Sequence, residues 1–451
     1  MKNYYLLLFF LLATITQSQV INFPDTNFKA RLLLASSNNQ IAYNNSNNAI
    51  KIDTNNNGEI EISEALAVYK LNLISSNFPV SSRISNMTGL SAFQNLRILD
   101  CIQNNLTQVD LLPLTLLEEF DGSYNSISTL DISNLVHLKK LLVPTNQITT
   151  ITQNNNTALE DIWIDNNLLT GSFNFTVFPS LKVILCNNNS LTSINVSGLL
   201  NIDEIECVNN LLPSLNLNGL TTLRILGFGG NQISNINLST LSTLNILNCQ
   251  GNPLSIINVN GLISLGQLNV SGTLISTIDC SQSGVIQLTA LSCPNLQTIN
   301  VRNGVYTYSD PDLLYYGFRI SNNPQLVSIC TDDGEQNQLV VDLLDYNYNT
   351  SGSVIVYNGD NCDIPVTVTM GISDFDKSTL KIYPNPTSEI VNIVISNNEP
   401  IIRTTVNNVL GQTIMTFENT TTLDISSLTK GTYFITIETD NDKHTQRIIK
   451  Q

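Results

Sequence analysis

The sequence is poor in charged residues and in residues that carry catalysis. Only 12% of its 451 residues are charged, acids outnumber bases 36 to 20, and there is a single tryptophan. The formal net charge of −16 repels phosphate groups, so nucleic acid is not expected as a partner. Neither histidine, His137 or His444, has a serine or cysteine at a recognisable catalytic spacing, and no glycine-rich phosphate loop or His-Glu-x-x-His motif occurs. The usual residues of an active site are missing, and we expect no enzyme activity.

The sequence also lacks long apolar runs, apart from a short one at its beginning. Residues 4–13 are apolar, a lysine precedes them, and the small residues Thr16 and Ser18 stand at −3 and −1 of a cleavage site after Ser18. This arrangement predicts a secretory signal peptide over residues 1–18. A membrane anchor is the alternative, but the run is shorter than the roughly 20 residues that a bilayer requires. We therefore expect a secreted or cell-surface protein with no transmembrane segment after cleavage.

A repeat occupies the centre of the chain. Residues 96–106 have the form LxxLxLxxNxL, which recurs at steps of 21 residues with one step of 22. The units begin at Leu96, Leu117, Leu138, Leu159, Leu181, Ile202, Leu223, Leu244 and Leu265. The pattern resembles the leucine-rich-repeat family over residues 84–330. Alternating apolar residues at positions 4–6 and 14–16 of each unit predict two strands per coil and leave no room for a helix. The expected fold is mainly β, a solenoid of 21-residue coils with parallel strands.

Position 9 of the units carries a column of asparagines. Its members are Asn104, Asn125, Asn146, Asn167, Asn189, Asn210, Asn231 and Asn252. An inward asparagine at a sharp turn is satisfied by hydrogen bonds to the backbone of its own and the neighbouring coil, so we expect a structural role. The column lapses at Thr273 and again near Cys293, where irregular coils are expected.

Most of the eight cysteines fall at inward positions of the repeat. Cys101, Cys186, Cys207 and Cys249 occupy position 6, and Cys280 occupies position 16. They are interpreted as small buried hydrophobic residues, although the spacing of adjacent coils leaves a Cys186–Cys207 disulfide open. Cys330 and Cys362 lie outside the regular coils, and we expect a disulfide between them. It would belong to a C-terminal cap over residues 331–363, followed by a linker over 364–374.

An acidic loop ahead of the repeats fits a calcium-binding pattern. Residues 53–64 match D-x-[DN]-x-[DN]-G-x5-E at every demanded position. The expected Ca2+ ligands are Asp53, Asn55, Asn57, the carbonyl of Glu59, Glu61 and both oxygens of Glu64. The loop looks like a dockerin-type half-site. With helix-like stretches at 27–35 and 65–71, residues 19–83 resemble the small helical N-terminal cap of secreted bacterial leucine-rich-repeat proteins. A turn without an ion is the alternative; bound calcium would be structural.

After residue 375 the composition changes to short strand-like segments separated by Asn-Pro, Leu-Gly and Lys-Gly turns. These features predict a small antiparallel β-sandwich. The order of the motifs resembles the type A C-terminal sorting domain of the type IX secretion system of Bacteroidota, over residues 375–451. The motif residues are Tyr383, Pro384, Asn385, Pro386, Gly411 and Gly431. The resemblance implies the type IX translocon and a sortase-like peptidase as partners, with the protein then released or anchored at the outer membrane. An ordinary adhesive sandwich is the alternative.

The outward strand positions offer a binding surface. Trp163 occupies position 5 of its unit, where the alternation directs side chains away from the core. The other candidate contact residues are Asp121, Tyr124, Leu142, Asp161, Asp165, Leu185 and Glu206. An aromatic side chain ringed by polar groups is typical of binding hot spots, and incidental exposure is the alternative. Glu118 and Glu119 imitate a glycosidase pair, but a solvated strand face is the simpler account.

We therefore expect a non-enzymatic recognition or adhesion protein that binds an extracellular protein or glycan through the solenoid face. A structural component of a surface layer or matrix is the second interpretation. An accessory protein of polysaccharide degradation is the third. A localised aromatic patch favours a ligand, whereas an even polar face favours the structural interpretation.

Overall fold

The computed structural model describes residues 19–305, 317–332, 355–358, 365–366, 380–383, 386–395, 400–408, 412–439 and 443–451. The chain divides into two compact units, Met1–Val368 and Thr369–Gln451. The expected signal peptide lies outside the described residues. Within them, no helix has both the length and the apolar character needed to cross a membrane.

The N-terminal region begins with α1 (Thr26–Leu33), as expected from the helix-like stretch at 27–35. Asp25 caps this helix by accepting a hydrogen bond of 2.9 Å from the amide of Phe28. The second expected helix, over residues 65–71, is wrong. A single turn, α2 (Ile62–Ala65), is followed by β2 (Lys70–Asn72), because the inward Leu71 joins the core of the first coil.

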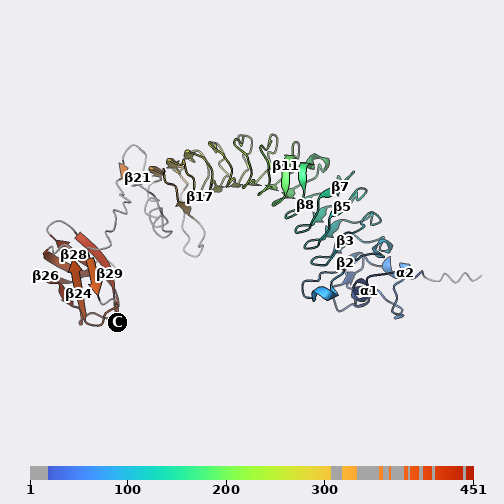
Figure 1. The fold of residues 1–451 in the computed structure, drawn as a ribbon, viewed down its shortest axis with the longest axis horizontal. Helices are drawn as coiled ribbons and strands as arrows, with labels where there is room; N and C mark the ends of the chain where they lie inside the picture. The colour runs from blue at the N-terminus through green and yellow to red at the C-terminus, as the bar shows by residue number, and fades with distance from the viewer. Residues whose placement is uncertain are drawn as a thin grey trace, which may run out of the picture. The chain divides into compact units, whose positions relative to one another are not determined.

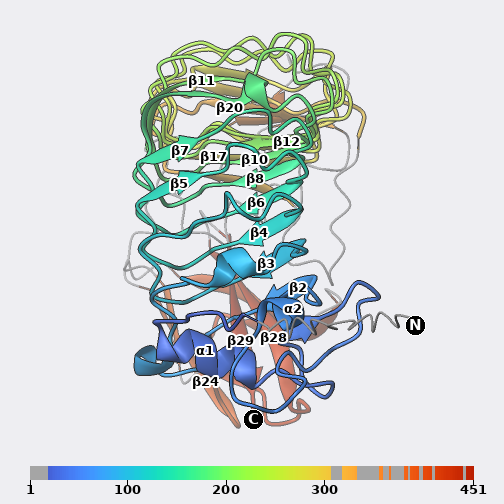
Figure 2. The same cartoon turned by 90° about the vertical axis from the view of Figure 1, so that its right-hand side faces the viewer.

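A 13-stranded sheet runs through the first unit. Its strands are β1 (Ala42–Tyr43), β2, β3 (Ile98–Asp100), β4 (Glu119–Asp121), β6 (Lys140–Leu142), β8 (Asp161–Trp163), β10 (Val183–Leu185), β12 (Glu204–Glu206), β13 (Ile225–Gly227), β14 (Ile246–Asn248), β15 (Gln267–Asn269), β17 (Gln287–Leu291) and β19 (Phe318–Ser321). The strands from β2 onward are parallel, and β1 closes the first edge by antiparallel pairing with β2. Figure 2 shows β3, β4, β6, β8 and β10 following one another as rungs. The predicted parallel solenoid is confirmed, and its sheet already begins within the expected cap.

The second strand of each coil forms only in parts of the solenoid. Two small parallel sheets have two strands each: β5 (Thr129–Asp131) pairs with β7 (Thr150–Thr152), and β9 (Thr170–Asn174) pairs with β11 (Ser190–Asn195). A third sheet contains, in order, the parallel strands β16 (Thr277–Asp279), β18 (Thr298–Asn300), β20 (Ser328–Thr331) and β21 (Ile355–Asn358). Its edge strand β22 (Pro365–Val366) pairs antiparallel with β21. In the coils between, residues 215–217 and 236–238 form no strand. Leu215 and Leu217 are nevertheless buried, so the inward alternation holds without a hydrogen-bonded ladder. Figure 1 shows the 13-stranded sheet on the inner side of the curved stack, with β11 on the outer side. Short 3₁₀ turns η1 (Val80–Ser82), η2 (Leu90–Ala92) and η3 (Phe175–Val177) complete the coils.

The asparagine column joins each coil to the one before it, as predicted. The Asn231 side-chain amide donates to the carbonyls of Cys207 and Phe228, both at 2.9 Å, and its oxygen accepts from the amide of Leu212 at 3.0 Å. Where the column lapses, the Thr273 hydroxyl donates to the carbonyl of Val270 at 2.7 Å. The coils there are irregular, as expected. Gln267 pairs with Gln287, a step of 20 residues, and Leu288 pairs with Phe318, a step of 30.

Five cysteines are buried free thiols, as interpreted from the repeat: Cys101, Cys186, Cys207, Cys249 and Cys280. Cys293 was not included in that interpretation but is also a buried free thiol. Cys186 and Cys207 therefore do not form the disulfide that the sequence left open. Burial raises the pKa of the Cys207 thiol to about 12, so it stays protonated. Cys330 is disulfide-bonded; its expected partner, Cys362, lies outside the described residues.

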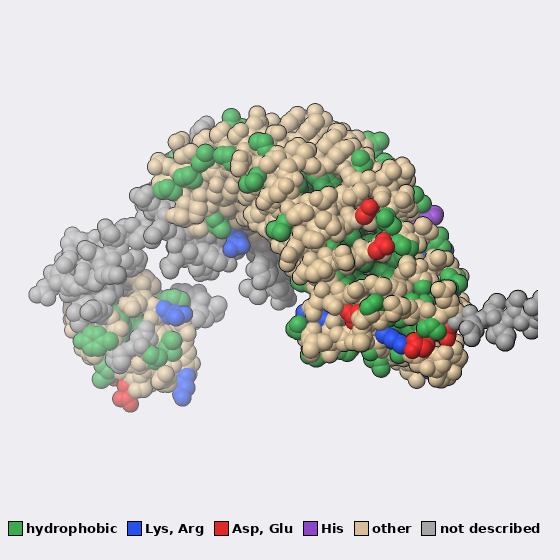
Figure 3. All heavy atoms as spheres, turned by 45° about the vertical axis from the view of Figure 1, so that its right-hand side comes forward, with side chains coloured by type: hydrophobic (Ala, Val, Ile, Leu, Met, Phe, Trp, Pro, Cys, Tyr) green, Lys and Arg blue, Asp and Glu red, His purple; other side chains and the backbone are tan. Residues whose placement is uncertain are grey.

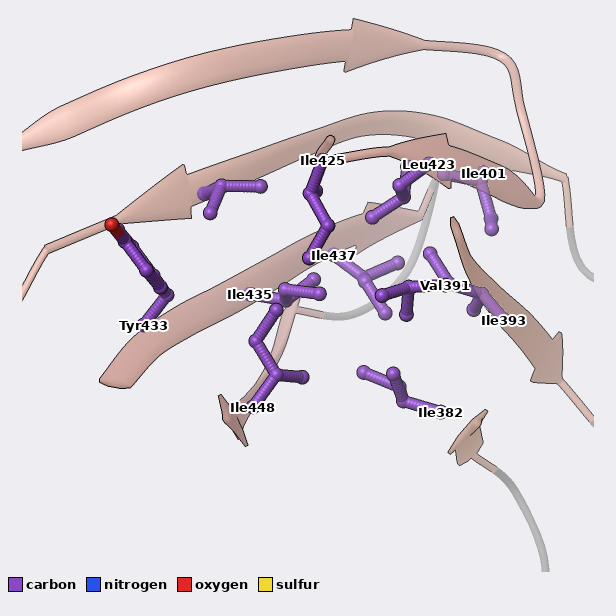
Figure 4. Close-up of a cluster of buried hydrophobic side chains, with 11 residues drawn as sticks. Ile382, Val391, Ile393, Ile401, Leu423, Ile425, Tyr433, Ile435, Ile437 and Ile448 are labelled. Atoms are coloured by element: carbon purple, nitrogen blue, oxygen red, sulfur yellow. The ribbon is translucent and has the colours of Figure 1, made fainter. Parts of the chain in front are cut away.

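The second unit is built from two antiparallel sheets. One contains β23 (Leu380–Tyr383), β24 (Ile390–Ile395) and β27 (Thr422–Asp424), and the other contains β25 (Ile401–Asn407), β26 (Thr413–Glu418), β28 (Gly431–Thr439) and β29 (Lys443–Lys450). Figure 4 shows their shared apolar core, to which the first sheet contributes Ile382 and Val391 and the second Ile435 and Ile448. This arrangement confirms the expected antiparallel C-terminal fold.

Candidate binding face

The candidate contact residues at position 5 form one row across the 13-stranded sheet. Strand register places Leu142 and Leu185 directly beside Trp163, on either side. Asp121 lies beside Leu142 and Glu206 beside Leu185, so an apolar centre is bounded by a carboxylate at each end. The Trp163 side chain is 39% exposed. The prediction that Trp163 points away from the core is therefore correct.

We define the Trp163 face as the outward residues at positions 3 and 5 of five strands, together with Tyr124. They are Glu119, Asp121, Lys140, Leu142, Asp161, Trp163, Val183, Leu185, Glu204 and Glu206 on β4, β6, β8, β10 and β12. Further along the sheet, position 5 carries Gly227, Asn248 and Asn269. The aromatic and aliphatic side chains of this row are thus confined to three neighbouring strands.

Tyr124 adds a second exposed aromatic ring, in an unfavourable backbone conformation. It is 57% exposed and has a φ of +56°. The equivalent positions also have positive φ, in later coils at Asn209 and Gly230 and in the two adjacent coils at Gln103 and Thr145, although asparagine and glycine tolerate that region far better than the other residue types do. The asparagines and glycines at this position of later coils indicate the left-handed turn in the sequence. We did not use them in interpreting the sequence. Gln103 and Thr145 share the strained backbone but are less exposed, so the exposed ring, and not the strain, distinguishes Tyr124.

Asp165 does not belong to this face, contrary to expectation. It is only 9% exposed, and one carboxylate oxygen accepts a hydrogen bond of 2.8 Å from the amide of Asn187 in the next coil. Burial raises the pKa of its carboxyl group. Asp165 thus links the turn that follows β8 to the next coil, where the repeat step is 22 residues. Periodicity alone does not reveal this contact.

Position 2 carries a row of alternating charges that our sequence reasoning missed. The residues are Arg97, Glu118, Lys139, Glu160, Lys182, Asp203 and Arg224. Ion pairs join neighbouring coils, at 2.7 Å from Lys139 to Glu118 and at 2.6 Å from Lys182 to Glu160. Exposed pairs of this kind contribute little to stability, because solvent screens the charges. The basic side chains at position 2 therefore lie beside the Trp163 face and not on it. Each has an acidic neighbour in the same row.

The expected calcium loop is held closed by its own hydrogen bonds. The carboxylates of Asp53, Glu61 and Glu64 are buried. Both oxygens of Glu64 accept hydrogen bonds, one from the amide of Thr54 at 2.7 Å and the other from the amide of Glu61 at 3.1 Å. Among the residues that the structure describes, no group of three or more His, Cys, Asp or Glu side chains is placed to hold a metal ion.

The remaining loop residues also have protein partners. Asn55 and Asn57 donate through their side-chain amides to the Glu61 carboxylate, at 3.2 and 2.7 Å. The side chain of Glu59 forms an ion pair with Lys29 at 2.8 Å. The oxygen-rich composition fits calcium chemistry, but bidentate binding requires Glu64 to leave the amides that it now accepts from. Calcium binding stays a prediction.

Hydrogen bonding dominates the electrostatics of Glu64. Burial alone would raise its pKa, but the hydrogen bonds from Glu61 and Thr54 lower it to about 2. Glu64 also forms a capping box with Glu61 at the start of α2. The charged form of Glu64 therefore stabilises the loop in this conformation.

The expected sorting motif lies partly within the described residues. Tyr383 ends β23 and is exposed, Pro386 precedes β24, and Gly431 begins β28. Pro384, Asn385 and Gly411 lie outside the described residues.

Comparison with known protein families identifies the C-terminal region. Residues 381–451 match the secretion system C-terminal sorting domain family. This match confirms the type IX sorting domain expected from the motifs. No curated protein matches the sequence at a significant level.

Solved structures resemble large parts of the chain. The functional domain of InlJ from Listeria monocytogenes, which includes a cysteine ladder, is 18% identical with a TM-score of 0.53, over 96% of this chain and 99% of that one. The internalin InlF from the same organism is 17% identical with a TM-score of 0.48, over 75% and 90%. The leucine-rich-repeat protein LIC12759 from Leptospira interrogans is 16% identical with a TM-score of 0.47, over 62% and 89%. The first similarity supports the fold alone. The chain is a leucine-rich-repeat solenoid that carries a type IX secretion system C-terminal sorting domain.

Proposed function

We propose that this chain is an exported, non-enzymatic recognition protein that binds an extracellular protein or glycan through the Trp163 face. The observation that carries the proposal is the row in which Trp163 lies between Leu142 and Leu185, with Asp121 and Glu206 at its ends. An exposed aromatic anchor surrounded by polar side chains is the usual composition of a binding hot spot.

The localisation of the apolar row favours a ligand over a purely structural role. A matrix component that packs against its own copies along the whole solenoid would present a similar surface on every coil. Here the coils after β12 carry glycine and asparagine at position 5, as at Gly227 and Asn248. Figure 3 shows, in the view drawn, mainly backbone and uncharged side chains, with few charged side chains visible.

Export through the type IX system follows from the sorting domain. We further propose that a sortase-like peptidase removes this domain at the cell surface and that the protein is then released or anchored at the outer membrane. Deletion of residues 381–451 should leave the remaining chain inside the cell, and cell fractionation measures this directly. Surface display without these residues would contradict the export route.

Binding of the secreted chain to immobilised extracellular proteins and glycans tests the recognition role. Trp163→Ala should weaken binding at least about tenfold, because hot-spot aromatic residues dominate interface energies. Ile256→Ala is the matched control, since Ile256 is 74% exposed and lies outside the Trp163 face. Equal binding by the wild type and both variants would refute the proposed surface.

A further inference from the structure

We propose that the partner of the Trp163 face is a protein that presents a basic segment, with a lysine or arginine side chain lying against Trp163. This inference rests on the proposed function, because it names the partner of the same surface. It follows from the way charge is distributed over the coils, which is independent of the aromatic row.

Carboxylates dominate the Trp163 face. Its acidic residues are Glu119, Asp121, Asp161, Glu204 and Glu206, and its single basic residue is Lys140. The Lys140 ammonium lies 4.0 Å from the Glu119 carboxylate. Among the described residues, no ion pair joins the other four acids to a base. The face is therefore negative in its own right and repels an anionic partner.

The other basic residues of these coils form ion pairs outside the Trp163 face. Lys139 and Lys182 stand at position 2 and pair with Glu118 and Glu160 of neighbouring coils. Arg224 pairs with Asp203 in the same row. Because these cations and anions alternate, the row at position 2 is close to neutral. On these strands, the negative charge that no base of the position-2 row pairs with thus lies at positions 3 and 5, around Trp163.

The geometry of the row suits an extended basic segment. Neighbouring strands lie about 4.8 Å apart, so Asp121 and Glu206 stand roughly 10 Å to either side of Trp163. A cation centred on the indole ring gains a cation–π interaction, and cations two residues away on the same face of the segment lie about 7 Å from it, from where their long side chains reach the two carboxylates. The intervening Leu142 and Leu185 offer aliphatic contact to the methylene stems of these basic side chains. The full row spans about 19 Å, the length of about six extended residues.

The half-buried acids favour the same partner. Burial raises the pKa of Asp161, and the Glu160 carboxylate adds to this, although the nearby Lys140 and Lys182 act in the opposite direction. Burial and the Glu206 carboxylate do the same for Glu204. Their charged forms are disfavoured in the free protein, so a nearby cation supplies compensation that a neutral glycan cannot supply.

The protein used for the test is the chain from residue 19 onward. Three probes are titrated into it to distinguish the possible partners. The first is a peptide of about six residues that alternates lysine and leucine, the length of the row. The second replaces each lysine by glutamate, and the third is cellohexaose, a neutral glycan. Binding is measured by isothermal titration at low and at elevated salt. We expect the lysine peptide alone to bind, and its affinity to fall as salt screens the carboxylates.

Variants separate this site from attraction to an acidic protein in general. Trp163→Ala, and separately the double variant Asp121→Asn with Glu206→Gln, should each weaken lysine-peptide binding about tenfold. The double variant should also reduce the salt dependence. Asp279→Asn, which neutralises an exposed carboxylate on β16 of another sheet, should leave binding unchanged. Thermal unfolding checks that each variant is folded.

The outcomes test the two proposals separately. Cellohexaose binding that requires Trp163, combined with lysine-peptide binding that ignores the Asp121 and Glu206 changes, would overturn the basic partner and keep the recognition surface. If Asp279→Asn weakened lysine-peptide binding as much as the Asp121→Asn and Glu206→Gln double variant does, the net charge of the protein would explain the binding. This result would overturn the basic-partner site. If Trp163→Ala changes the binding of none of the probes, both proposals fail.

Discussion

The asparagine column makes a quantitative prediction about the stability of the solenoid. In Asn231→Ala, the carbonyls of Cys207 and Phe228 lose a donor and the amide of Leu212 loses its acceptor. These groups lie inside the stack, since Asn231 is itself buried. Both carbonyls keep another donor, from Asn210 and Asn252, so each of their lost hydrogen bonds costs about 1 kcal/mol, whereas the Leu212 amide is left without a partner at a cost of about 1–3 kcal/mol. We expect a loss of about 3–5 kcal/mol in the free energy of unfolding.

Urea unfolding with hydrogen exchange measures this effect. Coils in a solenoid depend on their neighbours, so exchange at the amide of Leu212 should rise together with the loss of global stability. Asn235→Ala in the same coil is the control, because Asn235 is exposed, and it should change stability by less than about 0.5 kcal/mol. Asn231→Thr should recover part of the loss, by the hydrogen bond that Thr273 makes to Val270. If Asn231→Ala costs no more than the control, the column does not join the coils as described.

Three further predictions concern strain, acidity and calcium. Tyr124→Asn should raise the free energy of unfolding by about 1 kcal/mol, because asparagine tolerates the left-handed backbone, and should weaken ligand binding; an unchanged urea midpoint would argue against the strain. Burial and the neighbouring Asp121 carboxylate raise the pKa of Asp100 from 3.8 to about 6, so the stability that its proton confers is complete below pH 3.8 and lost as pH rises through 6. Asp100→Asn should remove that dependence and stabilise the protein by about 1–2 kcal/mol at neutral pH, after allowance for solvent screening, and unfolding across pH 4 to 8 tests it. If the 53–64 loop binds calcium, millimolar calcium should raise the melting temperature above that in chelator, and Glu64→Gln should abolish the difference; equal melting temperatures in the wild type would remove calcium from the account.

Much of the fold could be predicted because the repeat is local. Apolar residues spaced along a 21-residue unit determine which side chains face inward, so the strand positions and the outward Trp163 could be read without tertiary information. The buried cysteines followed from the same register. The second strand could not be predicted coil by coil, because residues 215–217 keep the apolar alternation but form no ladder with their neighbours.

The errors arose where contacts between coils decide the structure. Asp165 has the sequence position of a surface carboxylate but is buried, because the amide of Asn187 approaches it from the next coil. The stretch at 65–71 has a helical pattern, yet Leu71 enters the sheet beside Leu99, and tertiary packing overrides local propensity. The charge row at position 2 and the residue types at the Tyr124 position were visible in the sequence. They gained meaning only when the coils were stacked.

Fluorescence of Trp163 tests the central claim most directly. Because Trp163 is the only tryptophan in the chain, its emission reports on this face alone when the ligand contains no tryptophan. The free indole is partly exposed, so acrylamide should quench it. Titration with the lysine–leucine peptide should shift the emission to shorter wavelength and protect it from quenching, with the same affinity as the calorimetric titration. Saturable binding that leaves the emission and quenching of Trp163 unchanged would show that the partner contacts another surface.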